Sequence, residues 1–125
     1  MSRTAQYVSV PSGDFDAVVV RLGALGDVAL TTGVLAHWHR TRGMRFAVMT
    51  RKRFAPLFDL HPAVSGVMAI EEESLQSGWF TTANALARQY GHLPLVDLHG
   101  VGRTLLLASL WKGPYRKYPK LSFLR

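Results

Sequence analysis

The sequence predicts an α/β fold built on a doubly wound parallel sheet, and three observations lead to this class. Strand-like and helix-like segments alternate from residue 17 onward, which is typical of a parallel sheet. The first strand-like segment, Ala17–Leu22, is short, apolar and rich in β-branched residues, as in strands covered on both faces. Gly23 and Gly26 then permit a sharp turn into a helix. Right-handed crossovers place the first four strands in the order 3-2-1-4.

The first helix is predicted over Asp27–Arg42. Val28, Leu35 and Trp38 recur there at helical spacing, so they define one apolar face. Gly43 follows the last turn, where glycine commonly ends a helix. This segment therefore reads as the crossover between the first two strands.

Proline, glycine and polar residues bound the remaining elements. The later strands are predicted at residues 45–50, 66–70 and 94–98, with a fifth beginning within 115–118. The later helices are predicted at residues 54–60, from Ser77 or Thr81 to Tyr90, and at 103–111. Between the third strand and its helix, Glu71–Glu73 are consecutive acids. We expect them to lie in a loop and to be solvated.

The composition describes a chain that can build one packed domain. It has 125 residues, of which 48% are hydrophobic, so a core is affordable and global disorder is excluded. We expect residues 1–16 to form a lead-in and residues 17–125 to form the domain. Cysteine is absent, which excludes disulfides and thiolate metal sites. No apolar run approaches the ~20 residues of a membrane span, and no secretory h-region is visible.

The formal net charge is +7, and the excess lies toward the C-terminal end. No acidic residue follows Asp97, whereas six lysine and arginine residues do. A basic segment of this kind indicates an anionic partner such as a phosphorylated ligand, a lipid or a nucleic acid. A solvated basic face explains the same charge, and composition does not separate the two interpretations.

The glycine turn at Gly23–Asp27 fits neither standard phosphate-binding pattern. It lacks both G-x-G-x-x-G and the P-loop sequence. Asp27 has two interpretations: an N-cap that accepts a backbone N–H, or a carboxylate general base at a ligand cleft. Spacing alone favours the cap.

Three further polar residues stand at the ends of the first and fourth strands or just beyond. Arg21 sits inside the apolar first strand, which is costly unless the guanidinium is paired or reaches a polar edge. We favour an ion pair with Asp97 over anion binding. His99 reads as a solvated loop residue. Arg103 opens a helix, where a cation opposes the macrodipole, so we expect an anionic group near it.

Taken together, these segments resemble one known family. Val18–Thr32 (VVVRLGALGDVALTT) is similar to the opening motif of glycosyltransferase family nine, the ADP-heptose:lipopolysaccharide heptosyltransferases. Arg51–Leu57 (RKRFAPL) resembles the family's exit from the second strand. Val96–Gly100 (VDLHG), followed by Arg103, resembles its D-L-H/Q-G-x-x-R segment, and Tyr115–Lys117 resembles its next basic stretch.

The resemblance implies a fold and a place within a larger enzyme. Members resemble a GT-B architecture, in which a Rossmann-like N-terminal domain binds a lipid-linked, anionic sugar acceptor and a C-terminal domain binds the nucleotide sugar. Residues 17–125 would be an incomplete acceptor-side domain, with the donor domain absent. Such a fragment is expected to be inactive alone. Gly33 departs from the family, which often has proline there.

The resemblance also assigns roles to residues. Asp27 would be the catalytic base that takes the proton of an acceptor hydroxyl, which reverses the preference for a simple cap. The reaction would invert the anomeric carbon and release ADP. The residues implied in acceptor binding are Gly23, Gly26, Arg51, Lys52, Arg53, His99, Gly100 and Arg103.

The implied partners follow from this reaction. No cofactor or metal is expected, because ADP-heptose is a substrate. The acceptor belongs to lipopolysaccharide biosynthesis, which implies a cytoplasmic location and peripheral contact with the inner face of the bacterial inner membrane. A competing hypothesis is a non-catalytic Rossmann-like module that binds an anionic ligand. Nucleic-acid binding is disfavoured, because no recognised motif is present and the basic residues are not interleaved with aromatics.

Overall fold

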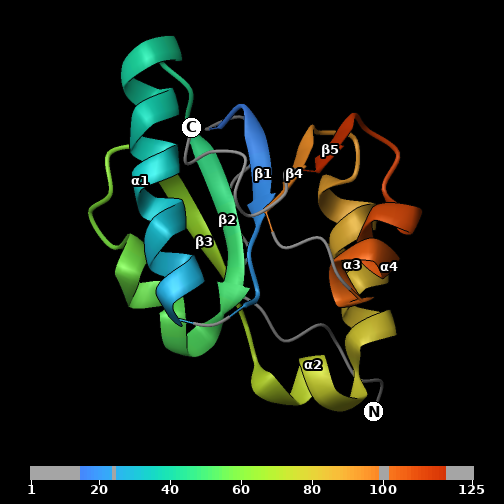
Figure 1. Cartoon of the computed structure of the whole chain (residues 1–125). Coiled ribbons are helices and arrows are strands. Elements are labelled where there is room, and N and C mark those ends of the chain that lie inside the picture. Colours follow the sequence, from blue (N-terminus) through green and yellow to red (C-terminus); the bar gives the residue numbers. More distant parts are fainter. Residues whose placement is uncertain (1–14, 24, 99–101, 118–125) are drawn as a thin grey trace.

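The computed structural model describes residues 15–23, 25–98 and 102–117. These residues form a five-stranded, all-parallel sheet in the order β3-β2-β1-β4-β5 (Figure 1). The predicted α/β class and the 3-2-1-4 order are confirmed. The strands are β1 (Ala17–Val20), β2 (Phe46–Arg51), β3 (Val64–Ile70), β4 (Leu95–Asp97) and β5 (Tyr115–Lys117).

Helices cover both faces of the sheet and one of its edges. Figure 1 shows α1 on one side, α3 and α4 on the other, and α2 beneath the ends to which β1 and β2 point. Among the described residues, no helix has the length and apolar character needed to cross a membrane. The helices are α1 (Leu25–Arg42), α2 (Glu72–Ser77), α3 (Trp79–Tyr90) and α4 (Gly102–Leu110), and a 3₁₀ segment, η1, spans Lys52–Phe58.

The central strand β1 contributes to two separate cores. Side chains alternate along a strand, so Val18 and Val20 pack with residues of α3 and α4, while Ala17 and Val19 pack with residues of α1 and η1. All four residues are almost fully buried. This explains the uniformly apolar β1 sequence, since both faces of a doubly wound sheet are covered.

The start of α1 differs from the prediction. The helix begins at Leu25, so Asp27 lies inside the first turn, and the N-cap interpretation is wrong. At the other end, Gly43 has a φ of 67° and its N–H donates to the His39 carbonyl at 2.9 Å. The glycine predicted to end this helix therefore adopts the left-handed conformation that glycine tolerates best.

Helix α2 was predicted as a loop. Glu72 and Glu73 occupy its first turn, where the positive end of the helix dipole favours acidic side chains. The next helix begins at Trp79 after Gly78, without a side-chain cap, so neither Ser77 nor Thr81 starts it. The remaining predicted boundaries agree with the structure to within about two residues, although the short helix after β2 is 3₁₀.

Candidate functional site

The candidate site lies at the carboxyl edge of the sheet, where β1 and β4 end side by side. The two strands pair in parallel with Val20 opposite Asp97, and the Leu98 N–H donates to the Val20 carbonyl at 3.2 Å. The glycine turn and the segment after β4 therefore leave the sheet at the same edge. His99 and Gly100, both predicted to bind acceptor, lie outside the described residues.

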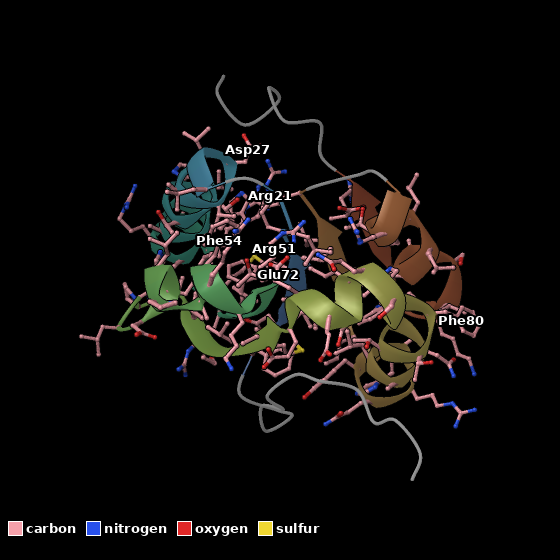
Figure 2. The ribbon with its side chains drawn as sticks, turned by 90° about the horizontal axis from the view of Figure 1, so that it is seen from below. Arg21, Asp27, Arg51, Phe54, Glu72 and Phe80 are labelled. Atoms are coloured by element: carbon pink, nitrogen blue, oxygen red, sulfur yellow. The ribbon has the colours of Figure 1, made fainter. Side chains whose placement is uncertain are left out.

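Arg21 and Asp27 form an ion pair at this edge. Arg21 Nη2 lies 2.9 Å from Asp27 Oδ2, with the arginine side chain 3% exposed and the aspartate 23% exposed. Figure 2, which views the molecule from below, shows the two residues beside each other at the start of α1. Burial lowers the pKa of the Arg21 guanidinium, while Asp27 and, more weakly, Asp97 oppose that shift. The Asp27 carboxylate is thus held by a buried cation and is partly exposed to solvent.

The predicted ion pair between Arg21 and Asp97 is wrong, for a geometric reason. Val20, which is in register with Asp97, faces the core on the α3 and α4 side. The next residue, Arg21, points toward the opposite face, where α1 supplies Asp27. Asp97 instead accepts a hydrogen bond from the Tyr115 hydroxyl at 2.8 Å. Burial, with this bond and the charge of Asp97, raises the pKa of Tyr115 to about 12.

Arg51 joins three segments at the same edge. Its Nε donates to the Leu22 carbonyl at 2.6 Å, and its Nη1 lies 2.7 Å from Glu72 Oε1. Leu22 immediately precedes the glycine turn, and Glu72 opens α2. Figure 2 shows Arg51 and Glu72 together under the sheet. Only 20% of the Arg51 side chain is exposed, so its main contacts are within the chain.

Lys52 and Arg53 are more accessible than Arg51. Lys52 Nζ lies 3.0 Å from Glu71 Oε2, and Arg53 Nε lies 3.9 Å from Glu72 Oε2. Their side chains are 65% and 66% exposed, and the Arg53 guanidinium also lies over the Phe54 ring at 5.0 Å. The expectation that the glutamates are simply solvated is therefore wrong for two of the three. Because β2 and β3 run parallel, the basic and acidic segments leave the sheet at one edge and pair.

Arg103 is anchored to α2. Its Nε donates to the Leu75 carbonyl at 2.9 Å, and its own carbonyl accepts from Trp79 Nε1 at 2.8 Å. Within the described residues, the Arg103 Nε thus meets a main-chain oxygen, and the anionic group expected near this cation stays a prediction. Arg103 remains exposed on the surface.

Space is available near the glycine turn. A Cβ at Gly26 would meet no heavy atom within 4 Å, so nothing packed against this residue requires glycine. The backbone is therefore open to an approaching group at Gly26, one residue before Asp27. Sequence reasoning missed the pairing of the basic run with Glu71 and Glu72 and the bond between Tyr115 and Asp97, because both depend on how neighbouring strands align.

The fold and this edge define a Rossmann-like α/β domain with charged side chains gathered where its parallel strands end. The chain has the fold of part of a "glycosyl transferase family 9" structure from Veillonella parvula DSM 2008, with a TM-score of 0.70 and 20% identity over 86% of this chain and 36% of that one. It is also similar to E. coli heptosyltransferase WaaC with ADP (TM-score 0.63, 21% identity, 81% of this chain and 35% of that one).

A third structure, E. coli heptosyltransferase WaaC with ADP-2-deoxy-2-fluoro heptose, has a TM-score of 0.60 and 20% identity over the same shares of the two chains. The chain thus spans about a third of the length of these proteins. No family model and no curated protein matches the sequence. The shared feature is the fold.

Proposed function

We propose that this chain is the acceptor-side part of an inverting glycosyltransferase, which moves heptose from ADP-heptose to a lipopolysaccharide core acceptor. The observation that supports this most directly is the Arg21–Asp27 ion pair at the carboxyl edge of the sheet, where open α/β sheets bind ligands. The fold likeness to a family 9 glycosyltransferase and to a heptosyltransferase agrees with it.

Asp27 would act as the general base. An acceptor hydroxyl attacks the anomeric carbon of the donor, the bond from that carbon to the ADP oxygen breaks, and the hydroxyl proton moves to the Asp27 carboxylate. Attack from the side opposite ADP inverts the anomeric centre. The Arg21 guanidinium at 2.9 Å stabilises the ionised carboxylate and fixes its orientation, which is what a positioned base requires.

The acceptor would lie across the open side of this edge. Gly23 and Gly26 leave room beside Asp27, and the exposed Lys52 and Arg53 carry charge that suits acceptor phosphates or carboxylates. Arg51 offers less surface, because it is bonded to Leu22 and Glu72.

The rest of the proposed acceptor site comes from the resemblance. It implies that His99, Gly100 and Arg103 line the acceptor side. The nucleotide sugar would bind to a C-terminal domain that this chain does not contain, so the chain alone would not transfer sugar. The proposal needs no cofactor, and it places the enzyme in the cytoplasm, in peripheral contact with the inner membrane that holds the acceptor lipid.

The test is Asp27→Asn in the full-length enzyme. Asparagine keeps the size of aspartate but cannot take the proton, so we expect kcat to fall roughly 10²–10⁴-fold with little change in acceptor binding. The ion pair is lost as well, so the melting temperature is expected to fall, and kcat must be measured below the unfolding range of both proteins.

Asp27→Glu is the matched control, because it keeps both the charge and a proton acceptor and should recover part of the lost turnover. An Asp27→Asn enzyme that is folded and retains most of its turnover would refute the catalytic role. Acceptor binding without any turnover by the full-length wild type would favour the non-catalytic module instead.

A further inference from the structure

A second charged region lies at the opposite edge of the sheet from Asp27. A hollow of about 580 Å³ opens between the last turns of α3 and α4. The residues around it end these helices and precede β4 and β5, so they stand at the amino ends of the strands. The lining residues are Asn84, Ala87, Arg88, Gly91, His92, Ser109, Leu110, Trp111 and Lys112.

The main chain under this hollow is held by close contacts. The Gly91 carbonyl accepts hydrogen bonds from the N–H groups of Gly113 at 2.6 Å and Lys112 at 3.2 Å. Trp111 Nε1 donates to the Leu93 carbonyl at 2.7 Å. A Cβ at Gly91 or Gly113 would collide with a neighbouring carbonyl, so both positions require glycine. The two helix ends thus form one fixed frame for the side chains they carry.

The polar side chains of the hollow are cationic or neutral. Arg88, His92 and Lys112 line it, all three exposed, and none of the described lining residues is acidic. No ion pair involves these three residues within the described part of the chain. The hollow is therefore lined by residues that carry a guanidinium and an ammonium group, and no described lining residue supplies a carboxylate to neutralise them.

The helix dipoles do not account for this arrangement by themselves. Cations near the carboxyl end of a helix are generally favourable, and Arg40 and Arg42 occupy that position on α1. Arg40 and Arg42, however, do not line the hollow. What distinguishes the ends of α3 and α4 is that their basic residues line one concavity together with the apolar residues Ala87 and Leu110.

We propose that this hollow binds a phosphate-bearing small molecule. Arg88 offers a planar fork of N–H donors that suits phosphate oxygens, Lys112 adds a point charge, and the Asn84 amide adds neutral donors. The apolar wall suits the carbon part of an organic phosphate. This site is separate from the proposed acceptor site, so either can be wrong without the other.

The test is binding of inorganic pyrophosphate to this chain, measured by calorimetry at low ionic strength. We expect saturable 1:1 binding, and the double variant Arg88→Gln/Lys112→Gln should raise Kd by roughly tenfold or more, because charge-assisted hydrogen bonds are lost. The matched control is Arg40→Gln/Arg42→Gln, which removes the same charge from another helix end. It should change Kd by less than about threefold at constant salt.

Three results would overturn the proposal: no saturable binding, equal weakening by the two double variants, or unchanged binding in the Arg88→Gln/Lys112→Gln protein with native circular dichroism. Amide shifts of Gly91 and Gly113 on titration would place the probe in the hollow, and shifts confined to other segments would count against it.

Phosphatidylglycerol vesicles separate a lipid source from a free phosphate. Vesicle binding that requires Arg88 and Lys112 while pyrophosphate fails to compete would replace the small molecule by a membrane surface.

Discussion

The two edges of the sheet carry the same kinds of cations in different surroundings. At the carboxyl edge, Arg21, Arg51 and Lys52 each lie within 3.0 Å of a carboxylate oxygen. At the amino edge, Arg88 and Lys112 have no such partner among the described residues. The first set pairs with carboxylates of the same chain, and two of its members, Arg21 and Arg51, are largely buried, whereas Arg88 and Lys112 lie exposed at the surface.

This difference shows how a run of charges in a sequence can mislead. Arg51–Arg53 stands out as a basic cluster, yet parallel strand pairing brings it against the glutamates that follow β3. Arg88, His92 and Lys112 are scattered along the chain and come together only in the fold. Basic residues are available to an anionic ligand when the elements beside them supply no acid, and sequence spacing alone does not show this.

The largest effect on stability is expected from Arg21→Met, which would break the paired state of the carboxyl edge. Arg21 is 3% exposed beside Asp27, with Asp97 nearby and fully buried. Removing the cation leaves these acids without its charge, and breaking a buried pair costs about 3 kcal/mol. Urea denaturation of the two proteins measures the loss. A matched change at an exposed arginine, Arg45→Met, should cost far less, and equal losses would contradict the buried-pair account.

A smaller loss is expected from Arg51→Met, which tests whether Arg51 supports the glycine turn. The variant loses the bonds to the Leu22 carbonyl and to Glu72, and we expect a cost of about 2 kcal/mol, because hydrogen bonds from a charged group are worth about 1.5–3 kcal/mol each and the site is partly solvated.

Hydrogen exchange provides a local measurement for the same variant. The amides of Gly23 and Gly26 should exchange faster in Arg51→Met, because the turn loses an anchor next to Leu22. Arg53→Met is the control, since its contact to Glu72 is 3.9 Å long and its side chain is 66% exposed. If both variants open the turn equally, Arg51 has no special positioning role.

The fold was predictable because its signals are local and repeated. The apolar run Ala17–Leu22, the helical spacing after Asp27 and the alternation of elements fix a parallel sheet, and the crossover rule then orders the strands. The missed helix, α2, is six residues long and starts with glutamates, so it carries almost no apolar periodicity. Its Leu75 belongs to the same buried core cluster as Met68 and Ile70 of β3, a packing contribution that the local sequence does not show.

The site was predictable in location but less so in its pairings. The position of Asp27 at the sheet edge follows from the strand–turn–helix pattern. The partner of Asp27 does not follow from this pattern. Arg21 lies one residue beyond β1, and the face of the sheet toward which its side chain points decides whether it meets Asp27 or Asp97. The same limit applies to Tyr115, whose contact with Asp97 requires the β4–β5 register.

The smallest effect on stability, and the sharpest test of the basic run, is expected from Lys52→Gln/Arg53→Gln. Both side chains are about two-thirds exposed, and exposed ion pairs contribute about 0–1 kcal/mol, so the free energy of unfolding should change by less than about 1 kcal/mol.

If the proposed acceptor carries phosphate or carboxylate groups, the same variant in the full-length enzyme should raise the acceptor KM by roughly tenfold with kcat unchanged, since it removes binding that is equal in ground and transition states. Arg40→Gln/Arg42→Gln removes the same charge far from this edge and should leave KM nearly constant. An unchanged KM in the Lys52→Gln/Arg53→Gln enzyme would mean that this run only pairs with Glu71 and Glu72. The proposed catalytic base, Asp27, would then lie at this edge without the cations that are predicted to bind the acceptor.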